Sequence, residues 1–399
     1  MKKFILVAAA RPNFMKVAPL VRAIEKHNRS VETKKERVKY VLVHTGQHYD
    51  FNMSDSFFED LKIPDPHIHL GVGSGSHAEQ TGKVMVEFEK VLLREKPEAV
   101  IVVGDVNSTL ACTLAAVKLT IPVAHVEAGL RSFDRTMPEE INRLVTDSLS
   151  TYLFTPSPDG GKNLLKEGVS AKKIYQVGDI MIDSLFFHMK EAEKSNILVR
   201  LGLQKNPSRI SPYALLTLHR PSNADDQGSL TKILKGLEVI SKRIPILFPV
   251  HPRTRKQLSA FGLQDKILFR DVRRRADLSS PGFYGMDPLG YLDFVKLMVH
   301  SRLVFTDSGG IQEEAMVLNI PCLTLRNTTE RPITITQGTN VLVWNDTQKI
   351  IREASKILAG KSKKAKIPAL WDGKTAERII KILVESPLKK RQQIRKFTK

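Results

Sequence analysis

The sequence predicts an α/β fold with two doubly wound, Rossmann-like domains that face a cleft. Apolar runs of strand length alternate with amphipathic helical segments in two series, which the polar stretch 195–212 separates. Nearly every predicted strand ends in polar or charged residues, where ligands bind in open parallel sheets. At 399 residues the chain is also longer than the chains that usually fold around a single hydrophobic core. We therefore expect domains at residues 1–195 and 196–372, followed by a C-terminal helix and basic tail at 373–399.

The composition argues against nucleic-acid and membrane proteins. The net charge is +20, and half of this excess lies in residues 361–399, without the interleaved aromatic residues that bind single strands. An anionic substrate is therefore favoured over a nucleic acid. No apolar run reaches the roughly 18–20 residues that span a bilayer. The run Phe4–Ala10 is short and stops at Arg11, which is atypical of a signal peptide, so we expect a cytoplasmic protein.

The first series begins with Phe4–Ala10, an uninterrupted apolar run expected for a parallel strand buried on both faces. Arg11 and Lys16 flank the change from strand to helix, where both cations can converge on one anion. Asp105 and Glu127 follow the next two well-defined strands of this series. Capping a helix is the ordinary role of such an aspartate, but a carboxylate directly after an apolar strand is costly unless it is paired or used.

Three further features of the first series have ordinary explanations. Glu139 opens a helix behind Pro138, and acids are common in a first helical turn. The spacing of His67 and His69 occurs in metal sites, but no thiol or carboxylate set accompanies them, so no metal is expected. The Gly/Ser-rich stretch 70–82 lacks the spacing of a dinucleotide-binding turn and reads as a loop.

The second series contains the clearest anion site, in residues 303–315. The strand Leu303–Phe305 turns through Ser308, Gly309 and Gly310 into a helix, whose first N–H groups can bind a phosphate. Glu314 lies one turn into that helix, where it could accept hydrogen bonds from a ribose diol. An ordinary turn in which Ser308 caps the helix is the alternative. Polar residues also end the neighbouring strands, at His219, His251 and Arg331.

These segments resemble the non-hydrolysing UDP-N-acetylglucosamine 2-epimerases. The matching segments include RPNFMKVAPL, HVEAGLRSFDRTMPEEINR, TDSGGIQEEA and LRNTTERP, in order over nearly the whole chain. The resemblance implies a glycosyltransferase-B-like fold whose C-terminal helix crosses back to the first domain, and no metal or redox cofactor. We also expect a homodimer. The resemblance further implies an isomerase of polysaccharide biosynthesis that interconverts UDP-N-acetylglucosamine and UDP-N-acetylmannosamine.

The resemblance also assigns residues. Positions near the sugar in the family correspond to Asp105, Glu127, Glu139 and His219. Positions that contact the nucleotide sugar correspond to Arg11, Lys16, His251, Phe294, Ser308, Gly309, Gly310, Glu314 and Arg331. The family eliminates UDP to a 2-acetamidoglucal and adds it back, because no adjacent carbonyl acidifies the C2 proton. Cations and N–H groups would stabilise the departing diphosphate, and carboxylates would move the proton.

Departures from the family pattern keep other functions open. Asn13 stands where many members have an acid. Relatives that act on UDP-diacetamido uronic sugars share the style of loop HTGQHYD, which makes such a sugar an alternative substrate. A hydrolysing 2-epimerase, which releases N-acetylmannosamine and UDP, and a glycosyltransferase of the same fold are further alternatives. A nucleic-acid-binding protein that uses the basic tail is the alternative from another class.

Overall fold

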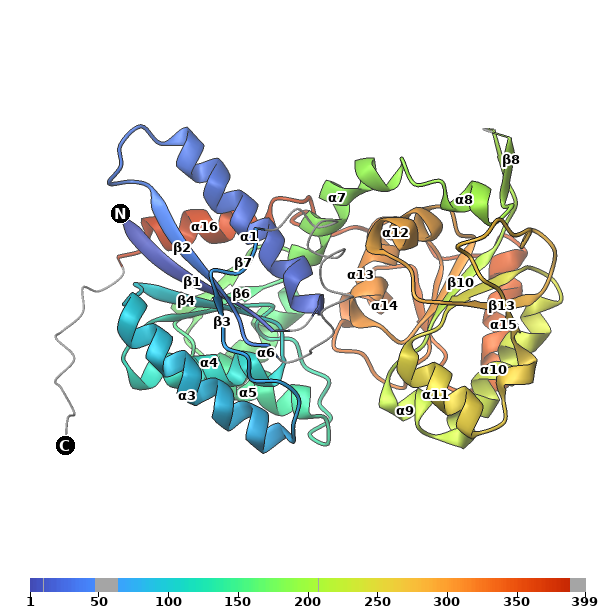
Figure 1. The fold of residues 1–399 in the computed structure, drawn as a ribbon, viewed down its shortest axis with the longest axis horizontal. Coiled ribbons are helices and arrows are strands. Elements are labelled where there is room, and N and C mark those ends of the chain that lie inside the picture. Colours follow the sequence, from blue (N-terminus) through green and yellow to red (C-terminus); the bar gives the residue numbers. More distant parts are fainter. Residues whose placement is uncertain (10, 47–63, 207, 388–399) are drawn as a thin grey trace. The chain divides into compact units, whose positions relative to one another are not determined.

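The computed structural model describes residues 1–9, 11–46, 64–206 and 208–387 (Figure 1). The chain divides into two compact units. Unit 1 comprises Met1–Ser184 together with the segment from Pro368 onward, and unit 2 comprises Leu185–Ile367. The division falls within helix α7 (Ile180–Ala192).

Unit 1 is built on a seven-stranded sheet in which every neighbouring pair is parallel. The strand order is β3-β2-β1-β4-β5-β6-β7. Strands β1 and β4 contain continuous apolar runs because both of their faces are buried. The strands are β1 (Lys2–Ala8), β2 (Val38–His44), β3 (Ile68–His69), β4 (Ala99–Val103), β5 (Val123–Val126), β6 (Tyr152–Thr155) and β7 (Ile174–Gln176).

Helices cover both faces of the first sheet. Figure 1 shows α1 and α16 on one side and α3, α4 and α5 on the other. Branched residues of β1 and β4, such as Ile5, Val100 and Val102, pack against Phe88 of α3 and Cys112 of α4. The helical segments are α1 (Arg11–Ser30), α3 (His77–Glu95), α4 (Asn107–Lys118), α5 (Pro138–Leu149), α6 (Pro158–Lys166), the 3₁₀ turn Ala171–Lys173 and α16 (Thr375–Glu385).

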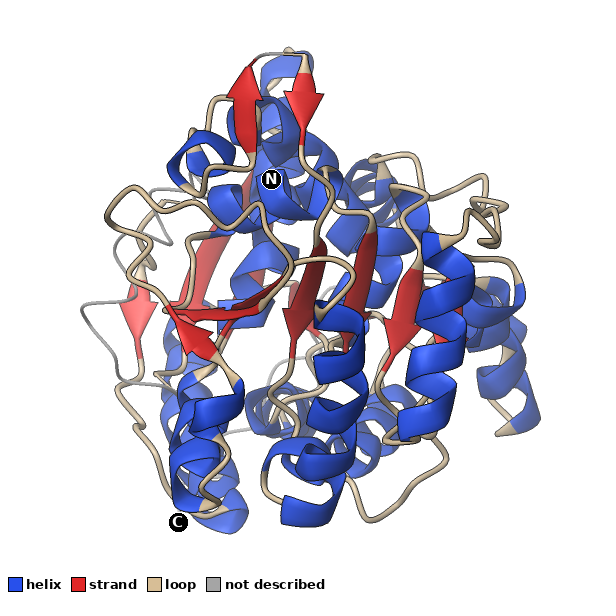
Figure 2. Cartoon of the chain, turned by 90° about the vertical axis from the view of Figure 1, so that its right-hand side faces the viewer, coloured by secondary structure: helices blue, strands red, loops and turns tan. Residues whose placement is uncertain are grey.

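Unit 2 repeats this plan with a second parallel sheet, which Figure 2 shows with its helices. Its order is β12-β13-β11-β10-β14-β15-β16. The strands are β10 (Ala214–Thr217), β11 (Ile246–Pro249), β12 (Leu268–Phe269), β13 (Phe283–Met286), β14 (Leu303–Thr306), β15 (Cys322–Thr324) and β16 (Asn340–Leu342). A separate antiparallel hairpin pairs β8 (Gln204–Asn206) with β9 (Arg209–Ile210).

Helices again surround the second sheet, and α10 packs against α15. The core joins Leu230, Ile233 and Leu237 of α10 to strand residues such as Leu216 and Phe248. The helical segments are α8 (Ile197–Arg200), α9 (Pro221–Ala224), α10 (Gln227–Ser241), α11 (Pro252–Ala260), the 3₁₀ turn Gln264–Lys266, α12 (Tyr291–Val299), α13 (Gly309–Val317), α14 (Pro332–Thr336) and α15 (Thr347–Leu358).

The two parallel sheets confirm the predicted fold class of two doubly wound Rossmann-like units. In each sheet the chain order reverses between two central strands, β1 and β4 in unit 1 and β10 and β14 in unit 2. Ligands bind outside the carboxyl ends of the strands at such switch points. None of the helices that the structure describes has the length and apolar character needed to cross a membrane.

Candidate functional site

A buried ion pair joins Lys16 of α1 to Glu127, the residue after β5. Their exposed fractions are 8% and 5%. Glu127 has a φ of +72°, an uncommon conformation for a residue with a side chain, and such strain gathers at functional sites. Gly104 lies beside the pair, because a Cβ at this position would be 3.0 Å from Lys16 Nζ. The glycine therefore provides the space that the lysine occupies.

Arg11 and Asn13 lie in the first turn of α1. Arg11 is the first residue of the helix, but its side chain lies outside the described residues. Asn13 is buried and donates a hydrogen bond from Nδ2 to the carbonyl of Val103, at 3.0 Å. This hydrogen bond fixes the end of β4. An ionised carboxylate at position 13 could not form it, because a carboxylate and a carbonyl both only accept.

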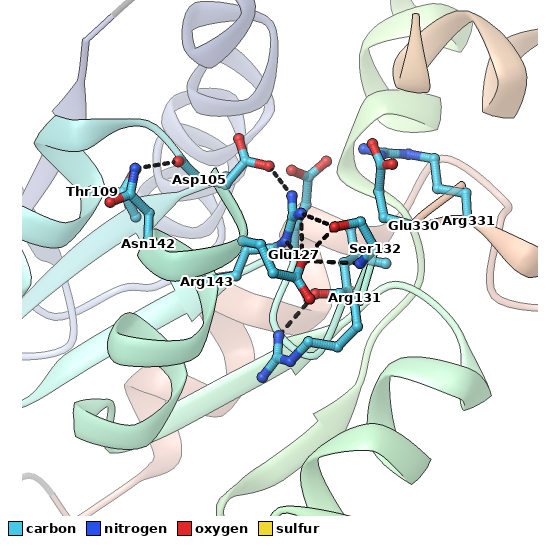
Figure 3. Close-up of polar contacts among 12 residues, drawn as sticks. Asp105, Thr109, Glu127, Arg131, Ser132, Asn142, Arg143, Glu330 and Arg331 are labelled. Atoms are coloured by element: carbon cyan, nitrogen blue, oxygen red, sulfur yellow. Dashed lines mark hydrogen bonds and ion pairs between the residues drawn. The ribbon is translucent and has the colours of Figure 1, made fainter. Parts of the chain in front are cut away.

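Asp105, at the carboxyl end of β4, belongs to a charge network with α5 (Figure 3). Arg143 pairs with Asp105 and, at 2.7 Å, with Glu140. Glu140 also accepts hydrogen bonds from the N–H and O–H of Ser132, both at 2.9 Å. Burial alone would raise the pKa of Glu140, but Ser132 and Arg143 lower it below its ordinary value. Glu140 thus fixes the arginine, while the side chain of Asp105 stays 31% exposed.

Glu139 lies outside this network. It is exposed on the first turn of α5, whereas its neighbour Glu140 is buried. Glu140 and Arg143 were not among the predicted site residues, although a signal for them exists in the sequence. Glu140, Arg143 and Asp147 recur at a helical spacing of three to four residues and are all buried. Charged residues on the inner face of a helix need partners, and here the partners include candidate site residues.

In unit 2, the turn after β14 leads directly into α13. Ser308 occupies the N-cap position, but its side chain makes no capping hydrogen bond. The alternative of an ordinary capping serine is therefore not what the structure describes. Gly309 is needed for a close approach, because a Cβ there would lie 2.6 Å from Arg331 Nη1. Gly309 and Gly310 form the first turn of the helix, whose N–H groups favour an anion.

Arg331 lies within a buried network of arginines and glutamates beside that turn. Its Nε is 2.6 Å from Glu313 Oε1, and its Nη1 is 2.7 Å from Glu330 Oε1. Glu330 also pairs with Arg326, at 2.6 Å, and with Arg220, at 3.3 Å. Burial alone would raise the pKa of Glu330, but Arg331, Arg326 and Arg220 hold it well below its ordinary value. Three guanidinium groups thus gather around Glu330, and groups of this kind can stabilise a diphosphate.

His219 and His251 follow the neighbouring strands β10 and β11. His219 Nδ1 lies 2.9 Å from Asp307 Oδ1, and its side chain is 41% exposed. Asp307 also accepts from the N–H groups of His219, at 3.0 Å, and Arg220, at 2.9 Å. The pKa of Asp307 lies below its ordinary value because these partners outweigh burial. The aspartate thus orients the His219 ring, as carboxylates do beside functional histidines.

His251 forms the N-cap of α11 with its ring. The ring Nδ1 accepts the N–H of Arg253, at 3.2 Å, so Nε2 carries the proton and can donate. The centroids of the His219 and His251 rings are 5.7 Å apart. The structure therefore brings these two predicted residues together at the carboxyl ends of adjacent strands.

Glu314 is buried on α13 and accepts a hydrogen bond from the hydroxyl of Tyr291, at 3.2 Å. Phe294 is half-buried on α12, the helix that also carries Tyr291. By contrast, His67 has a local structural contact, because its Nδ1 accepts the N–H of Leu42 at 3.1 Å.

Comparisons with known proteins agree with this arrangement. Residues 31–384 match the sequence model described as UDP-N-acetylglucosamine 2-epimerase. The UDP-N-acetylglucosamine 2-epimerase of Methanocaldococcus jannaschii is 44% identical over 385 residues, which are 96% of this chain and 98% of that protein. A crystal structure of the M. jannaschii enzyme in complex with UDP-GlcNAc and UDP aligns with a TM-score of 0.81 and 43% identity. The alignment covers 97% of this chain and 100% of the chain in that crystal structure.

A second kind of relative is almost as similar. The UDP-2,3-diacetamido-2,3-dideoxy-D-glucuronate 2-epimerase of Pseudomonas aeruginosa is 41% identical over 355 residues, 88% of this chain and 91% of that protein. Both relatives are 2-epimerases of UDP sugars, and they differ in the sugar that their names state. The family match over most of the chain, together with these identities, decides the assignment. The chain belongs to the UDP-N-acetylglucosamine 2-epimerase family.

Proposed function

We propose that this isomerase interconverts UDP-N-acetylglucosamine and UDP-N-acetylmannosamine by eliminating and re-adding UDP. Family membership supports the reaction class. The observation that carries the chemistry is the placement of two carboxylates, Asp105 and Glu127, at the ends of adjacent strands β4 and β5 in unit 1. One is partly exposed and paired with Arg143, and the other is buried and paired with Lys16.

The proposed reaction balances without an external reactant. A carboxylate removes the proton from C2, the electron pair forms the C1–C2 double bond, and the C1–O bond breaks as UDP leaves. In the reverse step a β-phosphate oxygen re-forms the bond to C1, and an acid delivers a proton to the other face of C2. Asp105, Glu127 and Glu139 are the proposed acids and bases, because their residue type can exchange a proton with carbon when it is held in place.

Unit 2 is proposed to hold the leaving group. The first turn of α13 (Gly309 and Gly310) and Arg331 would stabilise the charge that develops on the β-phosphate as the C1–O bond breaks. His219 and His251 would donate to phosphate oxygens or to the sugar, and Glu314 would accept from the ribose hydroxyls. Ser308 and Phe294 complete the proposed nucleotide contacts. In unit 1, Arg11 and Lys16 would add positive charge that stabilises an anionic substrate.

A UDP-diacetamido uronic sugar is the second candidate substrate, which the P. aeruginosa relative favours. Incubation of each UDP sugar with the protein in D₂O, followed by NMR, distinguishes the candidates. We expect deuterium at C2 and the mannosamine epimer to appear with UDP-N-acetylglucosamine. Deuterium incorporation into the diacetamido sugar alone would identify that sugar as the substrate instead. Release of free N-acetylmannosamine with UDP would identify a hydrolysing enzyme.

We further propose a homodimer that uses the outer face of α3. Val86 and Leu93, on this helix, are 56% and 47% exposed, and apolar side chains of this kind favour burial against a second copy. Light scattering at micromolar concentration is expected to give twice the mass of one chain. The double variant Val86→Glu with Leu93→Glu should give the mass of one chain if α3 forms the interface.

A further inference from the structure

A buried histidine, His125, connects the two turns that carry Asp105 and Glu127. It lies on β5 and has no exposed surface. Its Nδ1 is 2.6 Å from Asp147 Oδ1, and its Nε2 is 2.8 Å from the carbonyl oxygen of Gly104. A carbonyl oxygen only accepts, and an ionised carboxylate only accepts. Each ring nitrogen therefore faces an acceptor, and the ring bridges Asp147 and the Gly104 carbonyl.

The carboxylate of Asp147 is held by several donors. Its Oδ2 accepts the N–H of Gly129, at 3.0 Å, and lies 2.7 Å from Arg131 Nη1. Burial alone would raise the pKa of Asp147, but His125, Arg131 and the Gly129 N–H lower it below its ordinary value. Asp147 therefore stays ionised, and it fixes the chain two residues beyond Glu127 directly.

The backbone of Gly104 is held on both sides. Its N–H donates to the carbonyl of Val126, at 3.1 Å, and its carbonyl accepts from His125. Gly104 has a φ of +67°, and a Cβ there would lie 3.5 Å from Glu127 Oε2. The next residue is Asp105. A displacement of Gly104 would therefore move both the backbone of Asp105 and the surface that Glu127 contacts.

We propose that His125 and Asp147 are positioning residues, which hold the Asp105 and Glu127 turns in the geometry that proton transfer at C2 requires. This inference rests on the proposed epimerase function. Neither residue is proposed to touch the substrate, because both are fully buried. Their contribution lies in the relative position of the two carboxylates, and small errors in such positions slow proton transfer strongly.

Steady-state kinetics of three variants tests this role. His125→Gln removes the ring and can keep only one of its two contacts. Asp147→Asn replaces the carboxylate that Nδ1 of His125 contacts. His125→Gly leaves a space that added imidazole can fill. We expect kcat to fall about 100-fold in the first two, as for a misplaced catalytic group, while the Kd for UDP changes less than about 2-fold. Added imidazole should raise the kcat of His125→Gly at least about 10-fold over the value without imidazole, because the ring again bridges its two acceptors.

Ser150→Ala is the matched control. Ser150 is also fully buried, lies directly after α5 and donates to the carbonyl of Thr146, at 2.7 Å. Its loss should lower the unfolding temperature without lowering kcat. The inference is overturned if a folded His125→Gln or Asp147→Asn protein keeps kcat within about 3-fold of the parent, or if imidazole raises the unfolding temperature of His125→Gly and leaves kcat unchanged.

A measurement on the unaltered protein does not depend on how the variants fold. In ¹⁵N NMR of protein labelled on histidine, both ring nitrogens of His125 should give the signals of hydrogen-bonded nitrogens. A ring nitrogen that makes no hydrogen bond would overturn the inference. If the unaltered protein places no deuterium at C2 of any UDP sugar, the proposed function fails instead, and the ring measurement still reports on the bridge itself.

Discussion

Arg143 pairs with two carboxylates that differ in solvent exposure, the partly exposed Asp105 and the buried Glu140. Glu140 accepts three further hydrogen bonds, from Ser132 and Phe133, so the guanidinium has a fixed position. Asp105 is therefore oriented by a cation that cannot follow it into solvent. An acid held in this way loses little orientational freedom when it meets a substrate.

Neutral substitutions of Asp105 and Glu127 test their proposed role in proton transfer. Asp105→Asn and Glu127→Gln keep the shape of each side chain and remove its ability to exchange a proton. We expect kcat to fall by about 10²–10⁴-fold in each variant, while UDP binding by calorimetry stays near the parent value. Near-parent turnover in either variant would exclude that residue as an acid or base.

Glu139 and Glu140 are adjacent, but we expect opposite consequences from their replacement. Glu139→Gln changes an exposed residue and should lower kcat at an unchanged unfolding temperature. Glu140→Gln removes the buried partner of Arg143 and should destabilise unit 1 by about 3 kcal/mol, the usual effect of breaking a buried pair. Calorimetric unfolding and kinetics on both proteins separate the effects. Loss of stability in Glu139→Gln with unchanged kcat would reverse the assignment.

Gly309→Ala tests the proposed diphosphate site. The added methyl group would lie 2.6 Å from Arg331 Nη1, so the guanidinium must move away from the first turn of α13. We expect the Kd for UDP to rise by about 10-fold or more, which corresponds to about 1.4 kcal/mol. Gly82→Ala is the control, because open space surrounds Gly82 in α3. That change should leave UDP binding unaltered, and equal UDP affinities in the two variants would contradict the proposed site.

The raised pKa of Asp183 should make the free energy of unfolding of unit 1 depend on pH. Asp183 is buried and accepts the N–H groups of Thr375, at 3.0 Å, and Ala376, at 2.8 Å, at the start of α16. Burial raises its pKa from 3.8 to about 6 despite these bonds. The folded state therefore holds this proton more tightly than the unfolded state. Its contribution to stability is greatest below the unfolded pKa and declines as the pH rises through about 6.

Asp183→Asn should remove that decline. We expect the difference in unfolding free energy between variant and parent to change by up to about 3 kcal/mol, in favour of the variant, between pH of about 4 and about 7. Denaturant unfolding of both proteins across this range measures the difference. A difference that does not change with pH would show that Asp183 has an ordinary pKa.

The sequence was most informative where a residue's local position determines its role. Continuous apolar runs predicted the parallel strands because strands covered on both faces have no polar side to alternate. The glycines of the turn before α13 and the histidines at strand ends were visible because parallel strands bring their carboxyl ends to one edge. These features need no knowledge of which elements are neighbours in space.

The supporting residues could not be predicted in the same way. The helical spacing of Glu140 and Arg143 places them on one face of α5, but their connection to Asp105 depends on α5 lying beside the end of β4. His125 looked like an interior residue of a strand, and only its two partners, Asp147 and Gly104, reveal the bridge. Such contacts join positions 20 to 40 residues apart, about the length of a βα unit, which no local pattern encodes.

Positional isotope exchange tests the central claim, cleavage of the bond between C1 and the β-phosphate oxygen, most directly. UDP-N-acetylglucosamine is prepared with ¹⁸O in the bridging position of that bond and incubated with the protein. Because free UDP can rotate before it adds back, we predict that the label spreads to the non-bridging β-phosphate oxygens of the recovered sugar nucleotide, as ³¹P NMR reports. Epimerisation with the label retained entirely in the bridge would contradict the elimination of UDP.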